Sequence, residues 1–374
     1  MHRVAKHQIN FIKTNNLMQS RYNHKQIYPL AFCLLLLALA GFTYVKWLPY
    51  YAKAFQAQAN HSIGNSIIYN SAHVIPSVSF TAAIDYAMSY SKSIWKAMLL
   101  GLLLGSGIKV LIPSQWVSRW LGCFGVKNII RGGLLAIPCM MCTCCAAPVA
   151  AGMRQNKASV GSVVSWWLSN PLLNPATLVF MGFVLGWGWA AFRAVFAIVM
   201  VLIISYLAEK YAKSSDVNQL EDNITLQNEI LQQDISQQEN KNKPILFAWA
   251  QEFISMTVKL LPEYIMLVLL LGAARAWLFP VFGADESVIW IFAMALAGML
   301  FVIPTAGEVP IVQAMFVLGV GAGPAAALMM TLPAISLPSL IMLRNVFNLK
   351  TRLIIAAGVV FFGVLAGFVA RLIF

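Results

Sequence analysis

Long apolar runs separated by short polar connections dominate this chain. Runs of membrane-spanning length cover about residues 28–45, 94–112, 160–184 and 187–207, and further apolar runs follow residue 244. About 20 apolar residues in a helix cross the hydrocarbon core of a bilayer, so runs of this length with few charges predict membrane-spanning helices. We therefore expect an all-α polytopic membrane protein.

Composition supports this expectation. Hydrophobic residues make up 60% of the chain and charged residues 10%, against about 25% charged residues in a soluble domain. The 26 Lys and Arg outnumber the 13 Asp and Glu, but they lie mainly between apolar runs, as the positive-inside rule describes. We expect membrane lipid as a partner and no nucleic acid. The sequence has no phosphate-binding loop and no catalytic triad, so we expect no cofactor and no enzyme.

Charge and polarity divide the chain into six segments. A basic tail over residues 1–28 predicts a cytoplasmic N-terminus. A transmembrane anchor over residues 29–48 follows, with a cleaved signal peptide as the alternative. The other segments are a polar extracytoplasmic connection (49–93), a first transmembrane repeat (94–208), a polar cytoplasmic linker (209–243) and a second transmembrane repeat (244–374). Spaced apolar residues leave a short coiled coil as the alternative for the linker.

The second half repeats features of the first. The sequence Leu-Leu-Leu-Gly occurs at 102–105 and again at 269–272, and several prolines and glycines recur at one constant offset. A fixed register of such residues indicates two internal repeats. We predict that the repeats are inverted, with broken or re-entrant helices that meet near the bilayer midplane. The alternative is two parallel repeats with nine full crossings.

Four of the six cysteines lie within seven residues, at Cys139, Cys142, Cys144 and Cys145. On a continuous helix, Cys139, Cys142 and Cys145 would share a face roughly 120° wide, with Cys144 off it. Clustered thiols bind soft species such as trivalent arsenicals, copper(I) or mercury(II). We predict that all four bind substrate and that the three on one face could hold a metal. The alternative is that they are small apolar residues that allow close helix packing.

Prolines and two asparagines surround this segment. We expect helix breaks at Pro138, Pro148, Pro171, Pro175, Pro304, Pro310, Pro333 and Pro338. Asn170 and Asn174 each precede a proline, and we predict that their amides complete the substrate site. A purely structural kink is the alternative.

Three charged residues are candidates for proton coupling or gating. Glu308 matches Ala146 of the first repeat, so it would approach the thiols if the two copies meet, and intramembrane carboxylates are seldom kept without a function. Lys96 and Glu263 occupy matching positions, where they either pair across the repeats or reach the membrane interface separately. We expect Arg193 near a helix end.

These motifs together resemble the predicted-permease family that includes the organoarsenical efflux permease ArsP. The resemblance rests on the proline-flanked cysteine segment (138–148), Pro-Leu-Leu-Asn-Pro (171–175) and a degenerate copy (304–338). It implies an inner-membrane permease and, for some relatives, export of trivalent organoarsenicals. This chain departs from the family pattern in its denser cysteine segment and in Glu308.

The leading hypothesis is a secondary transporter that exports a small thiophilic species with proton coupling. One alternative is a permease for a small anion or a sulfur compound, bound by the dipoles of broken-helix N-termini. Another is a membrane thiol redox or metal relay. A homo-oligomer is compatible with each hypothesis.

Overall fold

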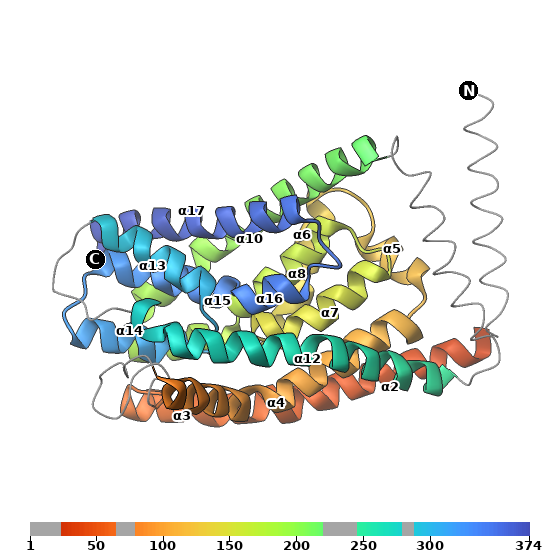
Figure 1. The fold of residues 1–374 in the computed structure, drawn as a ribbon, viewed down its shortest axis with the longest axis horizontal. Helices are drawn as coiled ribbons and strands as arrows, with labels where there is room; N and C mark the ends of the chain where they lie inside the picture. Colours follow the sequence, from red (N-terminus) through yellow and green to blue (C-terminus); the bar gives the residue numbers. More distant parts are fainter. Residues whose placement is uncertain (1–23, 65–78, 220–244, 279–287) are drawn as a thin grey trace.

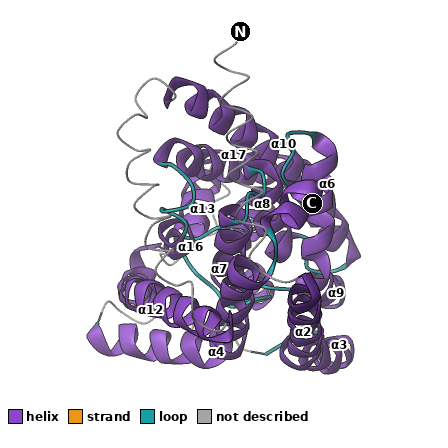
Figure 2. Ribbon diagram, turned by 90° about the vertical axis from the view of Figure 1, so that its right-hand side faces the viewer, coloured by secondary structure: helices purple, strands orange, loops and turns teal. Residues whose placement is uncertain are grey.

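A computed structural model describes residues 24–64, 79–219, 245–278 and 288–374. Within these ranges every regular element is a helix, which confirms the expected all-α fold (Figures 1 and 2). The N-terminal tail over residues 1–23 and most of the predicted linker, residues 220–243, lie outside the described residues. The linker's first residues, 209–219, continue a long helix.

The first half contains α2 (His24–Phe42), η1 (Thr43–Trp47), α3 (Leu48–Asn60), α4 (Phe80–Leu111), α5 (Ser114–Leu121), α6 (Val126–Ala136), η2 (Ile137–Cys139), α7 (Thr143–Gln155), α8 (Val160–Leu172), α9 (Pro175–Val184) and α10 (Trp187–Gln219). The second half contains α12 (Ile245–Leu278), α13 (Val288–Leu300), α14 (Glu308–Val317), α15 (Ala322–Ala334), α16 (Leu337–Met342) and α17 (Leu349–Ile373).

The two halves share one order of elements. In the first half a long helix (α4) precedes a broken pair (α6–α7), a second broken pair (α8–α9) and another long helix (α10). In the second half α12, α13–α14, α15–α16 and α17 follow in the same order. The long helices α4 and α12 pack together on one side, and α10 and α17 pack together on the other (Figure 1). Of the broken helices, α7, α8 and α15 are almost wholly buried.

Six helices of the described ranges are long and apolar enough to cross a membrane, and the pair α5–α6, bent by 113°, would add a seventh. Their burial differs widely. Residues 322–342, which include α15, have 89% of their most apolar window buried, whereas the N-terminal span Tyr28–Asn60 has 6%. Its exposed side chains include Phe32, Leu35 and Leu39. An apolar surface of this extent indicates contact with lipid.

The N-terminal helix is longer than the anchor expected over residues 29–48. Helical structure continues from α2 through the π-turn η1 and α3 to Asn60, and α4 starts at Phe80 instead of near Ile94. The π-turn precedes Pro49, whose missing N–H cannot bond to the previous turn, and the N–H of Leu48 bonds to the carbonyl of Thr43 five residues back. Much of the expected polar connection is therefore helix.

Glycines hold the cysteine segment against α4. A Cβ at Gly101 would overlap the carbonyl oxygen of Cys145, and one at Gly105 would overlap that of Pro148. Two small residues four apart let helix backbones approach closely in a membrane. Gly101 and Gly105, the last residue of the Leu-Leu-Leu-Gly motif, thus fix where α7 lies.

Candidate functional site

The first helix break lies within the cysteine segment. The 3₁₀ turn η2 ends at Cys139, Met140 adopts a left-handed φ of 50°, and α7 starts at Thr143 with Cys142 as its N-cap. The expectation that three thiols share one helical face is wrong. The left-handed backbone conformation of Met140 interrupts the helix between Cys139 and Cys142.

The structure brings two of the four thiols into direct contact. The Sγ atoms of Cys142 and Cys145 lie 2.9 Å apart and are buried. Cys144 Sγ lies 3.5 Å from the hydroxyl of Ser336, on the second half of the chain. Cys139 is half-buried, and its thiol donates to the carbonyl of Leu135 instead.

The trio of Cys139, Cys142 and Cys145 predicted as a metal site is not assembled here. Among the residues that the structure describes, no three His, Cys, Asp or Glu side chains gather closely enough to hold a metal ion. The contact between Cys142 and Cys145 is what remains as a binding element for a soft ligand.

The second break lies between α13 and α14, and it meets the first. A small cavity is lined by Cys142 and Thr143 of the first break and by residues 303–306 and Glu308 of the second. Pro171, Leu332 and Pro333 complete its wall. The cavity therefore lies where the two halves of the chain come together, and Glu308 and Cys142 both face it.

The N-terminal helix contributes a buried cation to the same region. Lys46 is 6% exposed, and its Nζ donates to the hydroxyl of Thr305 in the second break over 3.1 Å. The ammonium lies over the ring of Tyr50 and within electrostatic range of the Cys142 and Cys145 thiols. The helix predicted as a simple anchor is thus part of the site.

A neighbouring residue ties the same helix to the first break. The indole Nε1 of Trp47 donates to the carbonyl of Pro138 over 2.8 Å. Because Lys46 bonds to Thr305, two successive residues of the π-turn hold the two breaks of the site. Single π-turns inside α-helices are frequent at functional sites.

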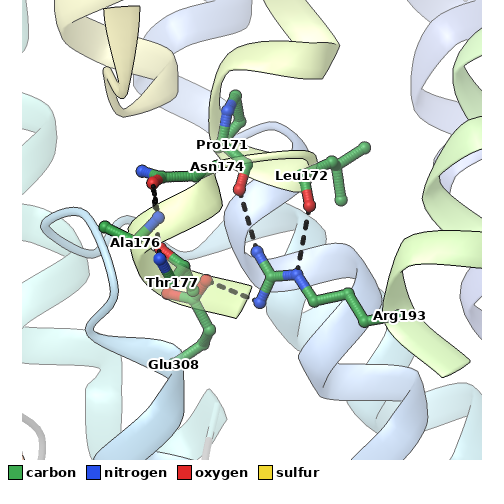
Figure 3. Close-up of polar contacts among 7 residues, drawn as sticks. All are labelled: Pro171, Leu172, Asn174, Ala176, Thr177, Arg193 and Glu308. Atoms are coloured by element: carbon green, nitrogen blue, oxygen red, sulfur yellow. Dashed lines mark hydrogen bonds and ion pairs between the residues drawn. The ribbon is translucent and has the colours of Figure 1, made fainter. Parts of the chain in front are cut away.

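A buried ion pair lies beside the cavity (Figure 3). Arg193 Nη1 of α10 lies 2.7 Å from Glu308 Oε1, and both side chains are at most 2% exposed. The same guanidinium donates to the carbonyls of Pro171, over 2.9 Å, and Leu172, over 3.3 Å. Arg193 lies in the first turns of α10, near the helix end as expected, but its side chain is fully buried and does not reach water.

The Pro-Leu-Leu-Asn-Pro sequence explains this arrangement. In an α-helix the carbonyl of Pro171 would accept from residue 175, but Pro175 has no N–H. The carbonyl of Leu172 would accept from Ala176, whose N–H donates to Asn174 Oδ1 instead. Both carbonyls are therefore available, and the guanidinium satisfies them.

The asparagines act within this framework. Asn174 caps α9 by accepting from the backbone N–H of Ala176 and Thr177. Asn170 accepts from the N–H of Met141 in the first break and donates to the carbonyl of Trp166. Their amides are engaged with the backbone, except Asn174 Nδ2, which has no hydrogen-bond partner in the described ranges.

The eight prolines do not act alike. Pro138, Pro171, Pro175, Pro333 and Pro338 lie at or next to helix ends, and Pro304 lies in the connection between α13 and α14. Helix breaks were also predicted at Pro148 and Pro310, but neither proline breaks its helix. Pro310 lies in the first turn of α14, where its missing N–H has no partner to lose. Pro148 lies inside α7, and the helix continues past it to Gln155.

Lys96 and Glu263 have separate partners, so the suggested pairing between them does not occur. Glu263 forms a half-exposed ion pair of 2.6 Å with Arg344. The Lys96 ammonium lies over the rings of Tyr44 and Trp95. Neither residue lines the cavity between the two helix breaks.

Sequence reasoning missed Lys46 and Arg193 as site residues. Each is a lone cation inside an apolar run, and intramembrane cations are costly unless they are paired. That signal could have selected both residues. The partner of each residue could not be predicted, because Thr305 and Glu308 are distant in sequence.

Comparisons with known proteins agree on the kind of protein. A family model described as predicted permease matches residues 79–372. The chain is 49% identical over 339 residues to UPF0718 protein YraQ of Escherichia coli strain K12, in an alignment that covers 90% of this chain and 93% of that protein. It is 24% identical over 338 residues to UPF0718 protein MJ0584 of Methanocaldococcus jannaschii, in an alignment that covers 74% of this chain and 91% of that protein. No solved structure matches the chain.

Proposed function

The chain belongs to the predicted-permease family, and from this premise we propose that it exports a small thiophilic species, such as a trivalent organoarsenical, across the bacterial inner membrane. Family membership makes it a membrane permease and not an enzyme. The observation that carries the finer proposal is the contact between the thiols of Cys142 and Cys145, because Cys142 lines the cavity between the two helix breaks.

The thiol pair offers two sulfur ligands to one soft atom. An organoarsenical with two hydroxyl groups on arsenic forms two As–S bonds as each thiol proton leaves with one hydroxide, which releases two waters. Hydrolysis of the same bonds returns the substrate and both thiols without any oxidant or reductant. Because the reaction reverses, it suits a carrier, which must release what it binds.

Alternating access follows from the two halves. In our proposal they form inverted repeats, with an N-terminus in the cytoplasm, and the helix breaks rock about the cavity between them. Basic residues support inversion: Arg154 and Lys157 follow the first re-entrant segment, whereas Arg344 and Lys350 follow the second half's later helices.

We assign proton coupling to the pair of Arg193 and Glu308. Addition of a proton to the Glu308 carboxylate removes the negative charge that neutralises the guanidinium, so the pair separates and α10 is released from α14. Glu308 also lines the cavity with Cys142, so substrate binding and this proton transfer occur at one place.

The test is growth and intracellular content of arsenic, copper and mercury in a hypersensitive bacterial host. Cells that express the wild type are challenged with methylarsenite, arsenite, copper and mercury. They are compared with a variant in which Cys142 and Cys145 are both Ser. A Cys33→Ser variant, altered at an exposed thiol of the N-terminal helix, is the matched control.

We expect protection against one of these species that the double variant loses and the control keeps. Protection that persists in the double variant, or no protection at all, would overturn the thiol mechanism. Loss with the double variant but full activity of Glu308→Gln would favour a thiol relay without proton coupling.

A further inference from the structure

A second and larger cavity lies next to the thiol cavity. Its volume is about 230 Å³, and it shares residues 304–306 of the second helix break with the thiol cavity. Lys46, Tyr50 and Lys53 of the N-terminal helix form one wall.

The wall of this cavity is positively charged without a compensating acid. Lys46 and Lys53 line it, and no Asp or Glu of the described ranges does so. The two lysines are seven residues apart, which places them on one side of a helix, two turns from each other. The nearby carboxylate of Glu308 is on the other cavity, where Arg193 neutralises it.

Hydroxyl groups accompany the two cations. Tyr50, Ser93 and Thr305 line the same cavity, and the Lys46 ammonium already bonds to the hydroxyls of Tyr50 and Thr305. Ammonium and hydroxyl groups donate hydrogen bonds, and anionic oxygens are the acceptors that make such bonds strongest. The chemistry of the wall therefore fits a carboxylate or another small oxyanion.

The position of the N-terminal helix is set by both halves of the chain. His61, just after α3, contacts the carbonyl of Phe183 and accepts at its own carbonyl from Gln313. With the bonds of Lys46 and Trp47 to the two helix breaks, these contacts fix the lysines over the cavity. The family model matches residues 79–372, so the lysines lie outside the part of the chain that it covers.

We propose that this cavity binds the anionic group of the substrate, so that Lys46 and Lys53 select thiophilic molecules that carry a carboxylate or similar oxyanion. The inference rests on the proposed function for the thiol end of the molecule. The lysines bind the charged end, and Cys142 and Cys145 bind the soft atom.

The test compares two probes that differ by one carboxylate: phenylarsine oxide and its 4-carboxy derivative. Binding to the purified full-length protein is measured calorimetrically at pH 7 in a non-ionic detergent without anionic lipid. The variants are Lys46→Met and Lys53→Met, with Lys92→Met as the control. Lys92 is an exposed lysine next to Ser93 that does not line the cavity.

We expect the wild type to bind the carboxylated probe on the order of 10-fold more tightly, the factor typical of one charge-assisted hydrogen bond. Added salt should reduce this preference because it screens the half-exposed site. Each cavity variant should bind both probes about equally, and Lys92→Met should keep the wild-type preference. Lys53 is exposed, so its variant tests the idea even if Lys46→Met fails to fold.

Equal binding of both probes to the wild type would overturn the anion site and leave the thiol mechanism standing. A preference that survives in Lys53→Met and Lys46→Met would also overturn it. Failure of the thiol mechanism is recognised separately. In that case the Cys142→Ser/Cys145→Ser variant would bind each probe as tightly as the wild type does.

Discussion

Replacing Glu308 by Gln removes one charge of the buried ion pair and keeps the size of the side chain. The Arg193 guanidinium would then lie in a fully buried site with only the neutral carbonyls of Pro171 and Leu172 and an amide as acceptors. Breaking a buried pair at one partner costs about 3–5 kcal/mol, mostly because the remaining charge is uncompensated. The amide oxygen can still accept from the guanidinium, so we expect the lower end of this range.

The effect is measured as a shift in the thermal unfolding midpoint of the purified protein in detergent. For a chain of 374 residues, about 3 kcal/mol corresponds to a decrease of about 4 °C. The matched comparison is a double-mutant cycle with Arg193→Met and Arg193→Met/Glu308→Gln. Once the cation is removed, loss of the carboxylate is much less harmful. We therefore expect the free energy of unfolding of the double variant to lie at most about 1 kcal/mol below that of Glu308→Gln.

Strictly additive shifts in this cycle would refute the reasoning. They would mean that the guanidinium and the carboxylate do not stabilise each other, whatever their distance.

Three further predictions concern contacts that build the site. Trp47→Phe removes the hydrogen bond to the carbonyl of Pro138, so the free energy of unfolding should fall by about 1 kcal/mol. Thermal unfolding measures this change, and an unchanged midpoint would argue against a stabilising bond between Trp47 and Pro138. Gly105→Ala forces a Cβ into the backbone of α7; we expect about 1–3 kcal/mol of destabilisation and poor detergent-extracted yield, and normal yield and stability would contradict the packing. Glu252→Gln breaks a partly exposed 2.7 Å pair with Lys109, and its shift should stay under about 1 kcal/mol, well below that of the buried pair.

Much of the fold follows from sequence because spanning helices need long apolar runs. Those runs gave the all-α class and most long helices, and the repeated order of elements follows the repeated motifs. The predicted helix ends were less accurate. The helix α4 begins at Phe80, whereas the prediction placed its start near Ile94, because the first turns of α4 contain polar residues that an apolar window excludes. Membrane helices can extend beyond the hydrocarbon core, where polarity no longer marks their ends.

The sequence pointed to some residues of the candidate site and missed others. Local chemistry identified the thiols, the asparagines and Glu308, because each stands out against an apolar background. The arrangement of the thiols was wrong, since spacing arguments assume a continuous helix and Met140 interrupts it. The partners Lys46 and Arg193 depend on contacts between distant segments, which no local pattern contains.

The bond between Lys46 and Thr305 joins residues separated by 259 positions. At about 5–20 residues per second, a ribosome makes the second residue roughly 13–52 s after the first. During this interval the N-terminal helix is already in the membrane with a cation whose hydroxyl partner has not been synthesised. The newly made helix must therefore keep Lys46 near the lipid headgroups or against the insertion machinery, and it can settle into its final place only after the second half has entered the bilayer. Biogenesis of this permease thus ends with the docking of the segment that was made first.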